Sequence, residues 1–143
     1  MAHKTLLDVN ICLDIMLDRK PHVKYSGRIF EAAENAEIDL FVSAISFDTM
    51  FYVMRPGTGA KKAVENLNLF LKHINVAGID ESTIQKALNS GWKDFEDALQ
   101  YFSALDAGCD SVTTRNSGDF HSTSIPVFTP QDFISQFLHV RKG

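Results

Sequence analysis

Four aspartates are the residues of this chain whose positions point most directly to chemistry. Asp8 directly follows a short apolar run. Asp48 comes a few residues after a second predicted strand, and Asp119 a few residues after a third. Asp97 lies in the first turn of a predicted helix. In an open α/β sheet the carboxyl ends of parallel strands share one rim, so carboxylates far apart in sequence can meet there. Clustered carboxylates repel one another unless a cation neutralises them, and oxygen ligands suit Mg²⁺ or Mn²⁺. The pattern therefore indicates a divalent-metal site of the kind that hydrolyses phosphodiesters.

Strands and helices alternate along the chain, as judged from apolar periodicity and capping residues. Strands are predicted at 4–8, 38–42, 75–78, 111–114 and 126–128, with 75–78 at an edge of the sheet. Helices are predicted at 11–17 with Asn10 as its cap, 22–35, 43–53, 60–73, 81–89, 94–108 and from Pro130 to near His139, with a break at 55–59. The alternation predicts an α/β fold, with a parallel sheet covered by helices on both faces. Because no repeat or linker interrupts it, we expect a single domain spanning residues 1–143.

Composition narrows the class of protein. The 143 residues are 45% hydrophobic, which fits a globular domain, and no apolar stretch approaches the length of a membrane span. The N-terminus leads straight into a strand and leaves no room for a signal peptide, so we expect a cytoplasmic protein. Cys12 and Cys109 lack metal-site spacing and are interpreted as reduced core thiols. The net charge of −4 argues weakly against a protein that coats nucleic acid, but it is compatible with a nuclease that gathers acids in one site.

Each candidate residue also has a purely structural explanation. Asp94 and Asp97 are three residues apart on one helix face, where Asp94 could cap the helix and Asp97 could simply favour its first turn. Asp48 lies within an otherwise apolar helix and could face solvent. The loop that follows residues 111–114 contains Asn, Gly and Asp, which are common turn formers as well as suitable ligands.

Four segments of the chain, taken in order, resemble the PIN domain. They are Leu6-Leu7-Asp8-Val9-Asn10, Ser43-Ala44-Ile45-Ser46-Phe47-Asp48, Asp94-Phe95-Glu96-Asp97-Ala98-Leu99 and Thr114-Arg115-Asn116-Ser117-Gly118-Asp119-Phe120, and residues 126–133 resemble that family's last strand and helix. The resemblance implies a Rossmann-like three-layer α/β/α sandwich and a Mg²⁺- or Mn²⁺-dependent ribonuclease. Many small prokaryotic members are toxins held inactive by an antitoxin protein, and dimers are common among them.

The resemblance also assigns roles by position. Asp8 matches the family's first acid and Asp97 its third. Asp48 stands where Glu is usual, Asn116 where Asp often follows Thr-Arg, and Asp119 resembles an additional acid found in many members. The expected metal ligands are Asp8, Asp97 and Asp119, the expected catalytic acids are these three with Asp48, and the expected RNA-binding residues are Thr114, Arg115 and Asn116.

Two other classes of function remain open at this stage. The departures at Asp48 and Asn116 favour a catalytically degenerate PIN-like domain that binds RNA or a protein without cutting. A phosphoryl-transfer or receiver-like protein would also place an aspartate after its first strand. It would, however, carry an Asp-x-Asp opening, or paired early acids with a late Lys, and neither pattern is present.

Overall fold

The sheet has the predicted parallel arrangement. The computed structural model describes residues 2–138, so the expected end of the last helix at His139 lies outside the described residues. The strands are β1 (His3–Leu7), β2 (Ile38–Ser43), β3 (Asn75–Ala77), β4 (Ser111–Thr113) and β5 (Val127–Phe128). All neighbouring pairs are parallel, in the order β3-β2-β1-β4-β5. This order places β1 at the centre and confirms β3 as an edge strand.

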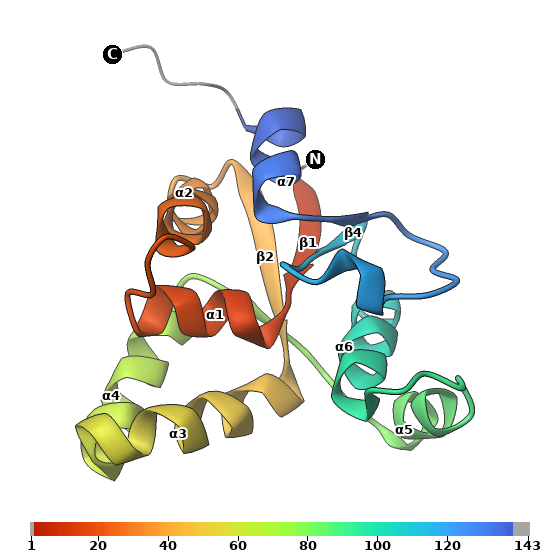
Figure 1. The fold of residues 1–143 in the computed structure, drawn as a ribbon, viewed down its shortest axis with the longest axis horizontal. Coiled ribbons are helices and arrows are strands. Elements are labelled where there is room, and N and C mark those ends of the chain that lie inside the picture. The colour runs from red at the N-terminus through yellow and green to blue at the C-terminus, as the bar shows by residue number, and fades with distance from the viewer. Residues whose placement is uncertain (1, 139–143) are drawn as a thin grey trace.

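Helices connect these strands and cover both faces of the sheet (Figure 1). They are α1 (Val9–Met16), α2 (Val23–Glu34), α3 (Ala44–Thr58), α4 (Ala60–Leu71), α5 (Glu81–Leu88), α6 (Phe95–Asp106) and α7 (Pro130–Phe137), with a short 3₁₀ turn, η1, at Ser117–Asp119. Helices α1, α2 and α7 pack together on one face, and α6 packs against the strands on the other face with α5 outside it. The expected three-layer α/β/α arrangement is thus confirmed. None of the helices within residues 2–138 is long and apolar enough to cross a membrane.

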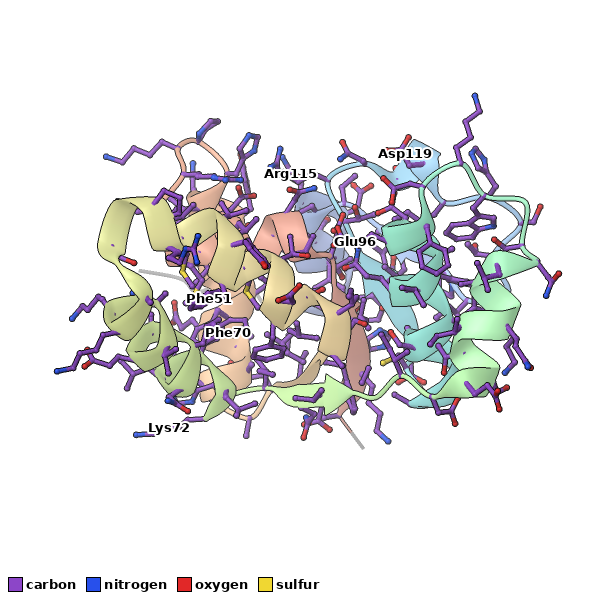
Figure 2. The ribbon with its side chains drawn as sticks, turned by 90° about the horizontal axis from the view of Figure 1, so that it is seen from below. Phe51, Phe70, Lys72, Glu96, Arg115 and Asp119 are labelled. Atoms are coloured by element: carbon purple, nitrogen blue, oxygen red, sulfur yellow. The ribbon has the colours of Figure 1, made fainter. Side chains whose placement is uncertain are left out.

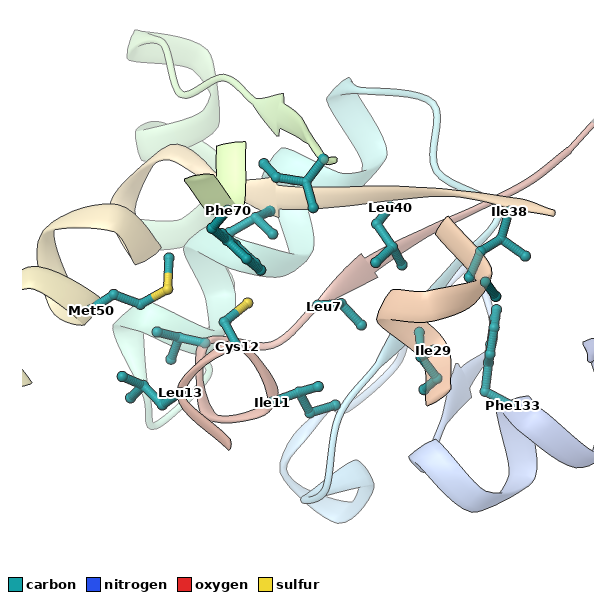
Figure 3. Packing of buried hydrophobic residues seen from close by; sticks show 14 of the residues in the cluster. Leu7, Ile11, Cys12, Leu13, Ile29, Ile38, Leu40, Met50, Phe70 and Phe133 are labelled. Carbon is teal, nitrogen blue, oxygen red and sulfur yellow. The ribbon is translucent and has the colours of Figure 1, made fainter. Parts of the chain in front are cut away.

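The central strand serves both cores because its side chains alternate between the two faces. Leu7 packs with Ile29, Leu40 and Phe133 in the larger core, between the sheet and helices α1, α2 and α7 (Figure 3). Its neighbour Leu6 points the other way, into the core beneath α6. All five of these side chains are buried. A strand buried on both faces reads as a continuous apolar run, which is how β1 could be recognised in the sequence.

A line of hydroxyl groups joins β1 to β4. Thr5 Oγ1 lies 2.9 Å from Thr113 Oγ1 and accepts a hydrogen bond of 2.8 Å from Ser111 Oγ, which lies 2.8 Å from His3 Nε2. The three hydroxyl side chains are fully buried, so each needs a partner inside the protein. Their mutual hydrogen bonds fix the relative position of the two strands whose ends carry the candidate site.

The structure corrects two local predictions. Helix α1 begins earlier than expected, because Asp8 and not Asn10 is its N-cap: Asp8 Oδ1 accepts a hydrogen bond from the Asn10 N–H. The predicted break at 55–59 is also too early, because α3 continues through Pro56 to Thr58 and turns only at Gly59, whose φ is +83°. Pro56 removes one donor to the preceding turn, but it sits on an exposed part of the helix where water can replace that donor.

Candidate active site

The site is built around the ends of the two central strands. The Asp8 N–H donates to the carbonyl of Thr113 at 2.9 Å, so strand pairing continues one residue beyond β1. Thr114, the residue after β4, then donates a hydrogen bond of 2.6 Å from its hydroxyl to Asp8 Oδ2. Both side chains are buried. The parallel register therefore brings together an acid and a threonine that are 106 residues apart in sequence.

A buried glutamine on α6 holds the other side of Asp8. Gln100 Nε2 donates to Asp8 Oδ1 at 3.3 Å, while Gln100 Oε1 accepts from the Val9 N–H at 2.9 Å and from the Ser46 hydroxyl at 3.4 Å. Sequence reasoning missed this residue. The available signal was its position: it lies three residues after Asp97, on the same face of the helix, within the stripe that faces the core. Gln100 of α6 thus bonds to the Asp8 carboxylate, the first residue of α1 and the Ser46 hydroxyl of α3.

Asp97 lies in the first turn of α6, and its surroundings oppose ionisation. The pKa of its carboxyl group is raised to about 7, chiefly because it is half buried, and further by the negative charges of Asp8, Asp94, Asp119 and Glu96. Asp94 is the N-cap of α6 and accepts the Asp97 N–H at 3.0 Å, so the predicted cap is correct. The raised pKa of Asp97 therefore reflects first its burial and then the negative charges around it.

The loop after β4 contributes the remaining predicted residues. Asp119 ends η1, is exposed, and lies close enough to act electrostatically on Asp97. Asn116 is also exposed, and its N–H donates to the Thr114 hydroxyl at 3.1 Å. Figure 2 shows Asp119 and Arg115 on the same side of the molecule, over the gap between the α3 and α6 halves.

Asp48 does not lie with Asp8, Asp97 and Asp119. Its side chain on α3 is exposed, and none of the contacts among residues 2–138 joins it to the other predicted acids. The residue that faces α6 is its neighbour Thr49, whose hydroxyl donates a hydrogen bond of 2.6 Å to Glu96 Oε2. Asp48 therefore keeps its place in the sequence pattern, but the structure does not bring it to the carboxylates.

Arg115 is engaged by a second buried acid, Asp14 of α1. Arg115 Nε lies 2.8 Å from Asp14 Oδ2, and its Nη2 donates to Asp14 Oδ1 at 3.3 Å. Asp14 is fully buried, Arg19 lies 3.9 Å from it, and Arg115 Nη1 is 3.4 Å from His22 Nε2. Sequence analysis did not place Asp14 in the site, although an acid within the apolar run of residues 11–17 was a visible signal. This ion pair anchors the loop that carries Thr114 and Asn116 to α1.

The carboxylates offer the oxygen ligands that Mg²⁺ and Mn²⁺ prefer, but they do not lie close enough together to coordinate one ion. Within the described part of the chain, no three Asp, Glu, His or Cys side chains are gathered closely enough to hold a metal ion as they stand. Asp8 is fixed by hydrogen bonds, whereas Asp97 and Asp119 lie on elements that approach it from different directions. The fit to Mg²⁺ or Mn²⁺ rests on the oxygen donors and on the raised pKa of Asp97, since a divalent cation would relieve that repulsion.

Comparison with known proteins agrees with this architecture. The family model of the PIN domain matches residues 4–118, which is most of the chain. The chain belongs to the PIN domain family. Over 141 residues, covering 95% of this chain and 96% of the other, it is 26% identical to Ribonuclease VapC1 of Aquifex aeolicus.

Solved structures of similar fold include VapBC-1 and a toxin–antitoxin complex. VapBC-1 from nontypeable Haemophilus influenzae superposes with a TM-score of 0.68 and 16% identity, covering 90% of this PIN domain and 98% of that chain. A toxin–antitoxin complex from Klebsiella pneumoniae gives a TM-score of 0.67 and 20% identity, covering 88% and 97%. At these identities the likeness establishes the PIN-domain fold, and the activity must be argued from the site.

Proposed function

We propose that this PIN domain is a divalent-metal-dependent endoribonuclease that hydrolyses phosphodiester bonds in RNA. The observation that carries the proposal is the half-buried Asp97 carboxyl group near the carboxyl rim of the sheet, whose pKa is raised by burial and by the negative charges of Asp8 and Asp119. The similarity to a ribonuclease over nearly the full length of both chains supports the same chemistry.

In this proposal Asp8, Asp97 and Asp119 would hold Mg²⁺ or Mn²⁺. When bound, such an ion supplies an activated water and stabilises negative charge on the scissile phosphate. The chain's own contribution is to prepare the ligands. Thr114 and Gln100 fix both oxygens of the Asp8 carboxylate, so this ligand needs no reorganisation. Asp97 would give up its proton as the ion binds, because the cation reverses the field that raises its pKa.

A pocket that contains Arg115 would receive the RNA backbone. It has a volume of about 300 Å³, and its lining includes His22, Tyr25, Arg115 and Asn116. Arg115 and Arg19 share the single negative charge of Asp14, so this part of the surface keeps a net positive charge. Since Arg115 directly follows Thr114, the pocket adjoins the carboxylates. A phosphate next to the cleaved one could bind there while the scissile phosphate lies at the acids.

The partner we propose is an antitoxin protein. The structural relatives are toxin–antitoxin assemblies, and the similarity to VapC1 spans the whole domain. A protein that cuts RNA inside the cell requires control, and occlusion of the acidic site by a bound protein would supply it.

A second candidate function is binding of RNA or protein without cleavage. It is favoured by the exposed position of Asp48 and by the absence, within residues 2–138, of three ligands already gathered for a metal. The two functions differ in whether the acids bind a metal with useful affinity.

Calorimetric titration of Mn²⁺ into the wild-type protein and Asp8→Asn distinguishes them. We expect saturable binding that weakens by about 10-fold or more in Asp8→Asn, because a ligand loses its charge while the side-chain shape is kept. Wild-type binding should then be accompanied by Mn²⁺-dependent cleavage of a random-sequence RNA pool. Failure of the wild-type protein to bind millimolar Mn²⁺ would favour the non-cleaving function.

A further inference from the structure

The α3 side of the acidic site is occupied by a glutamate that the sequence pattern did not single out. Glu96 lies in the first turn of α6, immediately before Asp97, and its side chain is half buried. Figure 2 shows Glu96 between α3 and α6, below Arg115 and Asp119. Asp48 is the acid that the family resemblance assigns to α3, but it is exposed.

A short hydrogen bond orients Glu96. Thr49 Oγ1 of α3 donates to Glu96 Oε2 at 2.6 Å, a length typical of a hydroxyl bound to an ionised carboxylate. The second oxygen, Oε1, accepts no hydrogen bond from the residues that the structure describes. One oxygen is therefore fixed to α3, and the other remains free to bind a ligand.

The charge of Glu96 belongs to the same cluster as the predicted metal ligands. Together with Asp8, Asp94 and Asp119, it raises the pKa of its sequence neighbour Asp97. An acid in the first turn of a helix is favoured by the helix dipole wherever it points. That explanation accounts for the residue type, but it does not explain why the carboxylate is turned into the gap between two helices, where it loses hydration and adds to the repulsion.

We propose that Glu96, oriented by Thr49, supplies the α3-side carboxylate of the metal-binding cluster, the place that the family pattern gives to Asp48. This inference rests on the proposed metal-dependent function. In this arrangement α3 orients Glu96 through the Thr49 hydroxyl group, and α6 provides two adjacent acids, Glu96 and Asp97.

Mn²⁺ affinity of three proteins tests the inference: wild type, Glu96→Gln and the matched control Asp48→Asn. Glutamine keeps an acceptor for Thr49 and nearly the same shape, so the variant removes charge alone. We expect the dissociation constant of Glu96→Gln to rise about 10-fold or more, and that of Asp48→Asn to stay within about 2-fold of wild type. Unchanged affinity in Glu96→Gln, or a larger loss in Asp48→Asn, would overturn the proposal.

Thr49→Val tests the orienting role separately, because it keeps both carboxylates and removes only the hydroxyl. We expect a loss of about 10-fold in Mn²⁺ affinity, at the low end of the range for outer contacts to metal ligands. Affinity equal to wild type would refute the role of Thr49. If wild-type protein binds no Mn²⁺, or if Asp8→Asn binds as tightly as wild type, the proposed function itself fails and this inference fails with it. Far-UV circular dichroism of each variant verifies that the fold is retained.

Discussion

Asp97→Asn should stabilise the metal-free protein above neutral pH and leave its stability unchanged near pH 4. The pKa of Asp97 is about 7 in the folded protein against an ordinary value of 3.8. Below pH 3.8 the carboxyl group is protonated in both states. Between the two values the unfolded chain ionises while the folded protein holds the proton, so stability falls as the pH rises. Above pH 7 the full cost of the buried negative charge is present. Asparagine never ionises and escapes this cost.

The size of the effect follows from the two pKa values. The interval between 3.8 and about 7 corresponds to at most about 4 kcal/mol, at about 1.4 kcal/mol for each tenfold change in proton affinity. Because Asp97 is only half buried, water screens its neighbours, and we expect about 1 to 2 kcal/mol at pH 8. For a chain of 143 residues this should raise the melting temperature by about 3 to 6 °C.

Urea unfolding in EDTA, measured at pH 4, 6 and 8, would show the predicted divergence between Asp97→Asn and wild type. Asp48→Asn is the control, because this aspartate is exposed and is not among the main groups that raise the pKa of Asp97, so its replacement should leave the pH profile unchanged. A stability difference independent of pH, or an Asp97→Asn protein less stable than wild type at pH 8, would refute the argument that repulsion and burial raise the pKa of Asp97.

Three further substitutions test the supports of the site. Gln100→Leu should lower the free energy of unfolding by about 2 to 4 kcal/mol, since it leaves the buried Val9 N–H without its hydrogen bond and removes one of the hydrogen bonds to the Asp8 carboxylate. Gln85→Leu on the surface should have little effect, and equal urea midpoints for the two variants would contradict this. Arg115→Met should cost about 3 kcal/mol, because it removes the main partner of a fully buried carboxylate. Asp14→Asn should cost less, about 1 kcal/mol, because the Arg115 side chain is 27% exposed and can reach water. If Asp14→Asn melted at a lower temperature than Arg115→Met, groups other than Arg115 would have to balance the negative charge of Asp14.

The parts of the fold that could be predicted from sequence depend on local signals. The alternation of apolar runs gave the five parallel strands, and Asp94 marked the start of α6 because an aspartate cap leaves a local signature. The errors also have local causes. Asn10 and Asp8 are both good caps, and only the path of β1 decides between them. Pro56 usually ends a helix, but here the exposed surface of α3 accommodates it.

The sequence identified site residues whose position is set by the end of a strand. It did not identify residues whose position depends on how a helix is rotated about its own axis. Asp8 was found because it follows the central strand. Gln100, Asp14 and Glu96 depend on how α6 and α1 are rotated against their neighbours, which is a tertiary property. The substrate roles expected for Thr114, Arg115 and Asn116 stay predictions, although the structure adds that Thr114 binds Asp8 and that Arg115 is held by Asp14.

The position of β1 at the centre of the sheet has a consequence for synthesis of the protein. Asp8 leaves the ribosome early, but its hydroxyl partner Thr114 belongs to a strand made near the end of the chain. Until β4 pairs with β1, Asp119 of η1 has no fixed position relative to Asp8, and Asp8 lacks its Thr114 partner. A nascent or prematurely terminated chain therefore carries every early acid and still lacks an assembled cluster. The parallel topology thereby delays any hydrolytic activity until translation is almost complete.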